Sequence, residues 1–313
     1  MVLKTFFSGG SIARAVHIRT DPGELALAWA GPSARVVTVW RSRCMVRNDE
    51  IVLLRPADVA TTIGLDDTIY LGQRHGKHVF AAMLGDEPTA SGLDETVFAG
   101  FRGLMGNLSA DDAALLAYAK GMVEWQQRHR YCGRCGTINK AETGGFTMIC
   151  SDLSCGQRNF PRIDPAIIVL VTTGDLCLLG RQSGWPESRY STIAGFVEPG
   201  ESLEDAVARE VREETNIEIE SARYLGSQPW PFPNAMMIGF HATGASTDIV
   251  LNDGELADAR WFSREELAAG LVSLPPVMSI AFRLIERWFD EWEGPRLEAL
   301  NLSTDFSRST DAG

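Results

Sequence analysis

Long apolar runs are missing from this sequence. No apolar stretch approaches the ~20 residues that a membrane-spanning helix needs. The N-terminal MVLKTFFSGGSIAR also lacks the apolar centre of a secretion signal. We therefore expect a cytoplasmic protein with no membrane partner.

Positive charge is also scarce. The chain carries 29 Lys and Arg against 41 Asp and Glu, a net charge of −12. This charge disfavours broad, non-specific binding to nucleic acid, although a local basic groove remains compatible with it. It does not exclude a small anionic ligand held through metal ions. The 313 residues, of which 45% are hydrophobic and 22% charged, are typical of a globular protein with one to three domains.

Cysteine is rare, with six in the chain, but four of the six are clustered. Two close pairs about 15 residues apart are typical of a structural zinc ribbon, in which four thiolates leave no open coordination position. Disulfides, redox thiols and a ribbon that binds nucleic acid are the alternative uses. The expected zinc ligands are Cys132, Cys135, Cys150 and Cys155.

The segment 195–217, GFVEPGESLEDAVAREVREETNI, predicts a loop followed by a helix. Ser202 can cap this helix, with Asp205 as its capping-box partner. Glu210, Glu213 and Glu214 stand at i, i+3 and i+4, so they share one helical face, where like charges repel. The face could be a solvated acidic surface, or it could bind hard divalent cations, which favour clustered carboxylate oxygens.

The order of residues in this segment favours the second interpretation. Gly195 is followed six residues later by Glu201, and then by Arg209-Glu210, Val211 and Glu213-Glu214. This pattern resembles the Nudix box, the signature of hydrolases that cut nucleoside diphosphates linked to another group. The closing glycine of the box is replaced by Asn216, which tolerates the left-handed backbone of a helix end.

The rest of the chain predicts an α/β protein built from four parts. Short β-type runs in the first part indicate a small α+β domain for scaffolding or dimerisation, and a capped helical pattern at 108–127 leads into the cysteines. Sheet elements around the box helix, with a last helix at 277–291, fit an α/β/α Nudix sandwich. The expected parts are 1–108, the α+β domain; 109–163, the linker helix and zinc ribbon; 164–292, the Nudix domain; and 293–313, a polar, frayed tail.

Residues 227–237, SQPWPFPNAMM, form a proline-rich stretch just beyond the box. Its prolines restrict the backbone around Trp230 and Phe232. These two rings could form a wall for an aromatic ligand, or they could simply pack in the fold. The string resembles the mark of the NADH pyrophosphatase (NAD diphosphatase) branch of Nudix hydrolases, which also carries a zinc ribbon before the Nudix domain. Ala235 stands where that branch usually has Ser, and the loss of a hydroxyl contact could loosen substrate preference.

This resemblance implies a site and an assembly. The resemblance implies that Glu210, Glu213 and Glu214 are catalytic and that, with Glu255, they bind Mg²⁺ or Mn²⁺. It does not imply which glutamate is a metal ligand and which is the catalytic base. The family position of Phe160 is usually Tyr, and in a homodimer this residue could reach the site of the partner subunit. The implied substrate-binding residues are Phe160, Phe196, Gln228, Trp230, Phe232 and Ala281.

The implied activity is metal-dependent hydrolysis of the pyrophosphate of NAD(H) to AMP and nicotinamide mononucleotide. The alternative is a Nudix hydrolase acting mainly on NAD-capped RNA 5′ ends or on ADP-ribose-type nucleotides. The net charge favours the free dinucleotide as substrate. A non-catalytic nucleotide- or RNA-binding module is the third possibility, but such a module has no need of the full set of carboxylates.

Overall fold

The computed structural model describes residues 3–59, 63–85, 93–94, 97–104, 106–252 and 254–303. Contacts divide the chain into two compact units. The N-terminal unit comprises residues 7–163 with 231–234, and the C-terminal unit comprises the described residues of 1–6, 164–230 and 235–313. Within the described residues, no helix is long and apolar enough to cross a bilayer.

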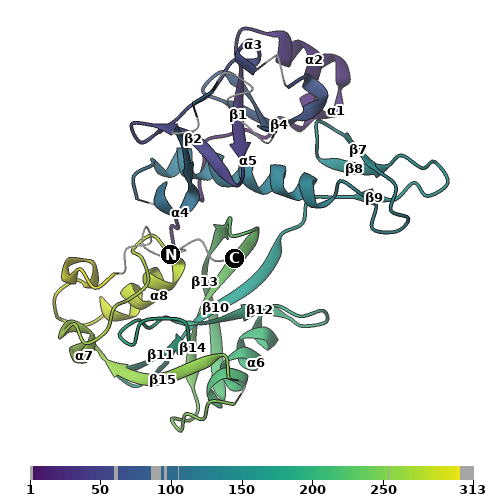
Figure 1. The fold of residues 1–313 in the computed structure, drawn as a ribbon. Helices are drawn as coiled ribbons and strands as arrows, with labels where there is room; N and C mark the ends of the chain where they lie inside the picture. Colours follow the sequence, from purple (N-terminus) through teal and green to yellow (C-terminus); the bar gives the residue numbers. More distant parts are fainter. Residues whose placement is uncertain are drawn as a thin grey trace. The chain divides into compact units, whose positions relative to one another are not determined.

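The N-terminal unit contains one mixed sheet, in the strand order β3-β2-β1-β5-β4 with β6 beside β2. Figure 1 labels three of its strands, β1, β2 and β4. Strands β1 and β5 pair in parallel, and the other neighbours are antiparallel. The elements are α1 (Val16–Thr20), α2 (Pro22–Ala30), β1 (Ala34–Trp40), β2 (Arg43–Arg47), β3 (Glu50–Ile51), α3 (Pro56–Val59), η1 (Leu65–Asp67), β4 (Thr68–Arg74), β5 (Lys77–Met83), β6 (Phe98–Gly100), α4 (Phe101–Leu104) and α5 (Ala110–Arg128).

Helix α5 is the predicted linker helix, and it begins directly after its N-cap residue, Ser109. Ser109 accepts a hydrogen bond from the Asp112 N–H, and the carboxylates of Asp111 and Asp112 lie in the first turn, where the helix dipole favours them. A small antiparallel sheet of β7 (Asn139–Glu142), β8 (Thr147–Cys150) and β9 (Arg158–Asn159) follows. These strands carry or adjoin the clustered cysteines. The expected separation of 1–108 from 109–163 stays a prediction, since residues 7–108 and 109–163 both belong to the N-terminal unit.

The C-terminal unit is built on a second mixed sheet, in the order β13-β14-β10-β11-β15 with β12 beside β10. Its central strand β10 pairs in parallel with β14 and antiparallel with β11 and β12. The elements are β10 (Asp164–Thr173), β11 (Leu176–Gln182), β12 (Ile193–Phe196), α6 (Leu203–Thr215), β13 (Ile219–Trp230), β14 (Ala235–Gly244), β15 (Leu256–Ser263), α7 (Arg264–Ala268), α8 (Ile280–Phe289) and η4 (Leu297–Leu300).

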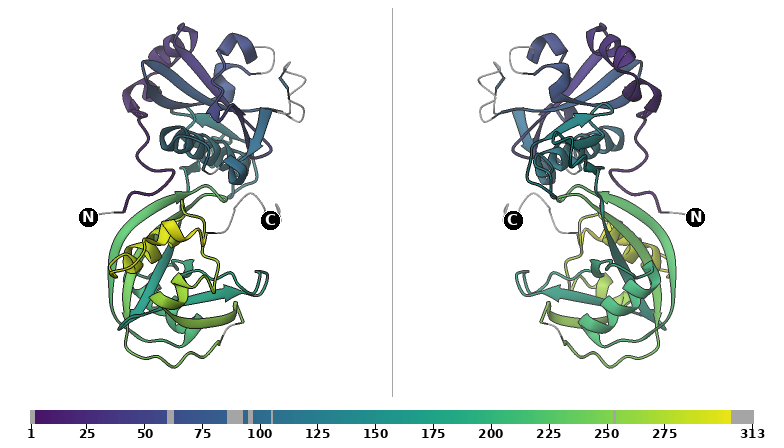
Figure 2. Two further views of the ribbon diagram at one scale, coloured as in Figure 1. Left: turned by 90° about the vertical axis from the view of Figure 1, so that its left-hand side faces the viewer. Right: turned by 90° about the vertical axis from the view of Figure 1, so that its right-hand side faces the viewer.

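Helices α6 and α8 cover opposite faces of this sheet. Alternate residues of β10 point to opposite sides. Ile167 and Val169 pack in a cluster that includes the apolar stripe of α6, while Ile168 and Leu170 pack with α8. The α/β/α sandwich expected from the sequence is therefore confirmed, and Figure 2 shows the sheet from two further sides.

Described residues near both ends of the chain pack into the C-terminal unit. The Leu3 N–H donates to the Leu225 carbonyl at 2.9 Å, and the Thr5 hydroxyl donates to the Ser227 carbonyl at 2.6 Å, so the first residues lie along β13. At the other end, Leu297 in η4 is fully buried with α8. This part of the predicted tail is therefore packed rather than frayed, and residues 304–313 lie outside the described residues.

Candidate active site

Helix α6 is fixed at both ends by its own sequence. The Ser202 hydroxyl accepts from the Asp205 N–H at 3.1 Å, and the Asp205 carboxylate accepts from the Ser202 N–H at 3.1 Å, which completes the predicted capping box. The helix ends at Asn216, which adopts a left-handed φ of 62°. Val207 and Val211 are buried against the sheet, so the turn that carries the carboxylates has a defined direction.

The three carboxylates of α6 occupy different environments. The side chain of Glu213 is 54% exposed, that of Glu210 is 12% exposed, and Glu214 is buried. Among the described residues they do not form a group of three ligand atoms close enough to hold an ion, as the cysteines do. The spacing therefore brings the carboxylates to one region of the helix without assembling a closed metal site.

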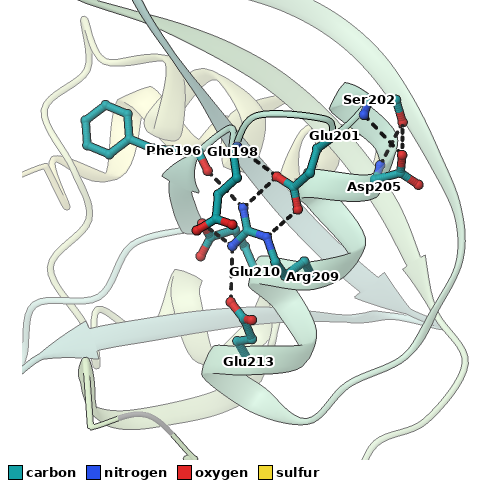
Figure 3. A network of polar contacts seen from close by, with 8 residues as sticks. All are labelled: Phe196, Glu198, Glu201, Ser202, Asp205, Arg209, Glu210 and Glu213. Carbon is teal, nitrogen blue, oxygen red and sulfur yellow. Dashed lines mark hydrogen bonds and ion pairs between the residues drawn. The ribbon is translucent and has the colours of Figure 1, made fainter.

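Arg209 lies at the centre of this acidic region (Figure 3). Its guanidinium donates to both oxygens of Glu201, at 2.5 and 2.9 Å, and to the Phe196 carbonyl at 2.9 Å. It also donates to Glu210 at 2.9 Å and to Glu213 at 3.1 Å. All five N–H donors are thereby used. Arg209 joins the loop before α6 to the helix and offsets part of the repulsion between the carboxylates.

The carboxylates around Arg209 differ in acidity. Arg209, followed by the Glu198 N–H, holds the pKa of Glu201 at about 2. Burial is the main reason why the pKa of Glu210 is raised, and the charges of Glu213 and Glu255 add to it while Arg209 opposes it. A further positive charge near Glu210 would favour its ionised form and so oppose the rise in its pKa. The donor set of this region therefore suits a hard cation.

Gly195 allows the Glu210 carboxylate to lie against β12. A Cβ atom built on Gly195 would lie 1.9 Å from Glu210 Oε1 and 2.0 Å from its Cδ. The φ of this glycine is not in the left-handed region, so the close approach, rather than backbone strain, explains why the position requires a residue with no side chain. The next residue, Phe196, is 61% exposed, and its ring points away from the carboxylates (Figure 3).

A hollow of about 770 Å³ opens beside the outer face of α6. Glu213 and Glu255, which are far apart in the sequence, both line it, and Arg209 lies on its wall. This hollow brings the predicted fourth acidic residue to the same region as the helix carboxylates. The lining residues are Ala208, Arg209, Arg212, Glu213, Asn216, Glu218, Asn252 and Glu255.

Gln228 lies deep in the C-terminal unit. Its side chain is fully buried, and its Nε2 donates to the carbonyls of Met278 at 2.9 Å and Phe6 at 3.2 Å. Its Oε1 accepts from the Ile280 N–H at 2.8 Å, so the side chain fixes the start of α8. Ala281 is the next residue of that helix and is buried. The structure thus gives Gln228 a positioning role that its place in the SQPWPFP string did not predict.

The two aromatic residues of the proline-rich stretch belong to different units. Trp230 ends β13 in the C-terminal unit, whereas Phe232 lies in the N-terminal unit. The Phe232 ring packs edge-on against Phe101, with centroids 6.4 Å apart, and the neighbouring Pro231 carbonyl accepts from the buried Lys120 ammonium at 2.8 Å. These contacts favour the packing interpretation for Phe232. Phe160, just beyond β9, is 63% exposed.

The four clustered cysteines are brought together as expected. Their sulfur atoms all lie within 4.8 Å of one another, with Cys135 and Cys150 3.4 Å apart and Cys132 and Cys155 3.8 Å apart. Four thiolates placed tetrahedrally around zinc at ~2.3 Å have sulfur atoms about 3.8 Å apart. All six cysteines of the chain are free thiols, and none forms a disulfide. The geometry therefore suits a tetrahedral metal site, whereas Cys177 lies outside the cluster and is buried in the core.

Two residues of this region, Arg209 and Glu201, were not assigned to the site from the sequence. Both occupy positions of the Nudix box, so the signal was present. What the sequence did not reveal is that one guanidinium would bond to three carboxylates and a backbone carbonyl at once.

Comparison with known proteins places the chain in a family. Residues 162–286 match the NUDIX domain, and residues 33–125 match an NADH pyrophosphatase-like rudimentary NUDIX domain. The NAD-capped RNA hydrolase NudC of Mycobacterium bovis is 36% identical over 290 residues, which cover 88% of this chain and 91% of that protein. The NudC of Stutzerimonas stutzeri is 46% identical over 187 residues, covering 60% of this chain and 66% of the relative. Human NUDT12, also named an NAD-capped RNA hydrolase, is 38% identical over 196 residues, covering 58% of this chain and 42% of its own length. With its carboxylate helix, its cysteine cluster and these matches along most of its length, the chain belongs to the NADH pyrophosphatase branch of the Nudix hydrolase family.

Proposed function

We propose that this enzyme hydrolyses the pyrophosphate bond of NAD(H) to give AMP and nicotinamide mononucleotide. The observation that carries the proposal is the arrangement of Glu210 and Glu213 around Arg209, beside a hollow that Glu255 also lines. A hollow lined by three carboxylates, those of Glu213, Glu218 and Glu255, suits a polyanionic phosphate ester held through cations.

Glu210, Glu213, Glu214 and Glu255 would hold Mg²⁺ or Mn²⁺. Divalent ions bound there would neutralise phosphoryl oxygens and lower the pKa of a bound water. The raised pKa of Glu210 has burial and neighbouring carboxylates as its causes, which fits a ligand that awaits a cation. An exposed carboxylate such as Glu213 can also accept a proton from an attacking water. We assign zinc to the cysteine cluster, where four thiolates leave no position for substrate.

Stacking on exposed aromatic rings would hold the nicotinamide or adenine base. Phe196 follows the glycine that lies against Glu210, and it is largely exposed. We further propose that Trp230 contributes to the same wall, and that the chain forms a homodimer in which Phe160 reaches the partner's site. Mixing Phe160→Ala chains with inactive Glu213→Gln chains should then restore activity above the sum of the two. If subunits exchange and nothing is restored, the shared site is excluded.

NAD-capped RNA is the second candidate substrate. The relatives that match most of the chain are named NAD-capped RNA hydrolases. The bond cut would be the same, with an RNA chain extending from the adenosine ribose. We also propose a cytoplasmic location, because free thiols at metal-binding spacing are typical of a reducing compartment.

Comparing turnover of three substrates tests the proposal. Purified protein would be assayed on NADH, ADP-ribose and NAD-capped RNA, each with Mg²⁺ and with Mn²⁺, and AMP or the uncapped 5′ end would be quantified. We expect NADH cleavage that depends on the metal and falls by about 10²-fold or more in Glu213→Gln. Release of AMP from ADP-ribose alone would assign the enzyme to another Nudix substrate class. Absence of turnover on all three would overturn the assignment as a hydrolase of NAD-type pyrophosphates.

A further inference from the structure

The net charge of the chain is unevenly distributed between the two units. The C-terminal unit carries 12 Lys and Arg against 25 Asp and Glu, whereas the N-terminal unit carries 17 against 16. The whole negative excess therefore belongs to the unit that contains the carboxylate helix. The negative charge of the whole chain therefore does not limit what the N-terminal unit can bind.

Within the N-terminal unit, cations gather in the cysteine-bearing segment 128–162. This segment holds six Lys and Arg against two Asp and Glu. Four thiolates around one Zn²⁺ would contribute −2, which still leaves an excess of positive charge. Five of the six cations are exposed and form no ion pair with any described residue. They are Arg128, Arg130, Arg134, Lys140 and Arg158.

Strand register places two of these cations on one face of the small sheet. Lys140 of β7 pairs with Ile149 of β8, and Ile149 pairs with Arg158 of β9, so the three form one row across the sheet. Tyr131 bridges to Ile138, which lies two residues before Lys140 and hence on the same side. We call these five residues the ribbon face.

Three residues on the opposite side of the sheet are buried, which marks the ribbon face as the more outward side. Asn139, Met148 and Cys150 alternate with the residues of the ribbon face, and all three are buried. On the ribbon face, the Tyr131 ring is 59% exposed and Ile138 is also exposed. The guanidinium of Arg130 lies 5.7 Å from the centre of the Tyr131 ring. The outward side thus combines unpaired cations with an exposed aromatic ring and aliphatic side chains.

A solvated polar surface would account for the cations but not for the exposed apolar side chains between them. Exposed rings interleaved with cations are the arrangement that binds single-stranded nucleic acid without sequence preference, since bases stack on the rings and phosphates meet the cations. A folded partner of opposite charge would cover the cations but would have no need of a stacking ring.

We propose that the ribbon face binds the single-stranded RNA chain that follows an NAD cap, as a site separate from the one that cuts the pyrophosphate. This inference rests on the second candidate substrate of the proposed function. It predicts that the enzyme gains affinity for the capped RNA from a surface that plays no part with free NADH.

Charge reversal on the ribbon face provides the test. The variant Lys140→Glu/Arg158→Glu should raise KM for NAD-capped RNA about tenfold or more, because two phosphate contacts are lost and repulsion replaces them. Turnover of NADH should be unchanged. The logarithmic dependence of RNA affinity on salt should become shallower by about 1.4, since each phosphate contact on a single strand contributes about 0.7. Tyr131→Ala should weaken RNA binding and leave the salt dependence as it was.

A matched control has the same change of charge elsewhere in the N-terminal unit. Arg47 and Lys77 are also exposed and also form no ion pair among the described residues, so Arg47→Glu/Lys77→Glu should leave KM for capped RNA near the wild-type value. If the two double variants lost affinity for capped RNA equally, the effect would come from net charge alone, and the proposed binding site on the ribbon face would be wrong. A ribbon-face variant that dissociates from dimer to monomer in light scattering would show that a second copy covers this face, and would overturn the proposal as well.

Direct binding separates this inference from the proposed function. A fluorescent, uncapped single-stranded RNA would be titrated against the wild type and the ribbon-face variant, with anisotropy as the readout and no cleavage required. Weaker binding of the variant supports the ribbon face even if capped RNA is not cut. Equal binding by the two proteins refutes it, even if NADH hydrolysis is fully confirmed.

Discussion

Gly195→Ala is the sharpest single test of the carboxylate site. The added methyl group would lie 1.9 Å from Glu210 Oε1 and 2.4 Å from its Oε2. Ordinary contacts of a Cβ begin near 3.4 Å, so the carboxylate has to retreat by about 1.5 Å, the difference between 3.4 and 1.9 Å. Nothing else in the backbone opposes alanine here, since φ at this position is not left-handed.

We expect this displacement of the Glu210 carboxylate to slow mainly the chemical step. A misplacement of about 1 Å in a reacting arrangement costs on the order of 10²-fold in rate. We therefore expect kcat on NADH to fall by at least about 10²-fold, equivalent to roughly 2.7 kcal/mol of lost transition-state stabilisation. The fold should survive, because Glu210 has a partner in Arg209 and is not one of the apolar core residues that hold α6 against the sheet.

The assay is AMP release from NADH with Mg²⁺, alongside a thermal melt for each variant. Gly184→Ala is the matched control, since a Cβ there would meet nothing within 4 Å. A second control tests whether Gly195→Ala acts through the Glu210 carboxylate. Glu210→Asp shortens the side chain, so adding Gly195→Ala to it should cost little more than Glu210→Asp alone. Near-wild-type kcat in a folded Gly195→Ala enzyme would refute the requirement for Glu210 at this place.

Four further outcomes follow from the site. Glu213→Gln should lower kcat by about 10²-fold or more with an unchanged melting temperature, as expected for loss of a key charge; unchanged turnover would remove this residue from the site. Cys135→Ser should lower both zinc content, measured by elemental analysis, and melting temperature, because metal binding at such sites contributes to folding; a metal-free wild type would contradict the ribbon. Phe196→Ala should raise KM for NADH about tenfold through lost stacking, while kcat falls less; an unchanged KM would exclude the ring. Arg209 holds the pKa of Glu201 at about 2, below its ordinary 4.5, so the stability that this carboxylate adds is complete above pH 4.5 and is lost as pH falls towards 2. Glu201→Gln should therefore make the melting temperature less dependent on pH between 4.5 and 2, and an unchanged pH dependence would contradict the ion pair.

The elements that a local pattern controls were predictable from the sequence. Ser202, Asp205 and Asn216 define both ends of α6 through contacts within a few residues, and these contacts are found as expected. The cysteine cluster was predictable for a similar reason, since its spacing is set by two tight turns. In each case the information lies in residues that are near one another in the chain.

The contacts that join distant residues could not be inferred in this way. Gln228 was expected to bind substrate, but it lies buried between Phe6 and the start of α8, more than 200 residues from the former and about 50 from the latter. Phe232 and Trp230 are both aromatic residues next to prolines in the sequence, yet Phe232 packs against Phe101. The parallel pairing of β1 with β5 is of the same kind, because single-strand patterns do not specify partners.

The position of the first few residues affects how the chain can fold as it leaves the ribosome. Thr5 bonds to the carbonyl of a residue 222 positions further along, in a strand of the C-terminal unit, while almost the whole N-terminal unit lies between them in the sequence. The N-terminal unit can therefore fold first, with residues 3–6 held outside it and waiting for β13 to be synthesised. Residues 3–6 can therefore find their partners only after β13 has been made, and a nascent chain stalled before β13 would expose them to the solvent and to chaperones.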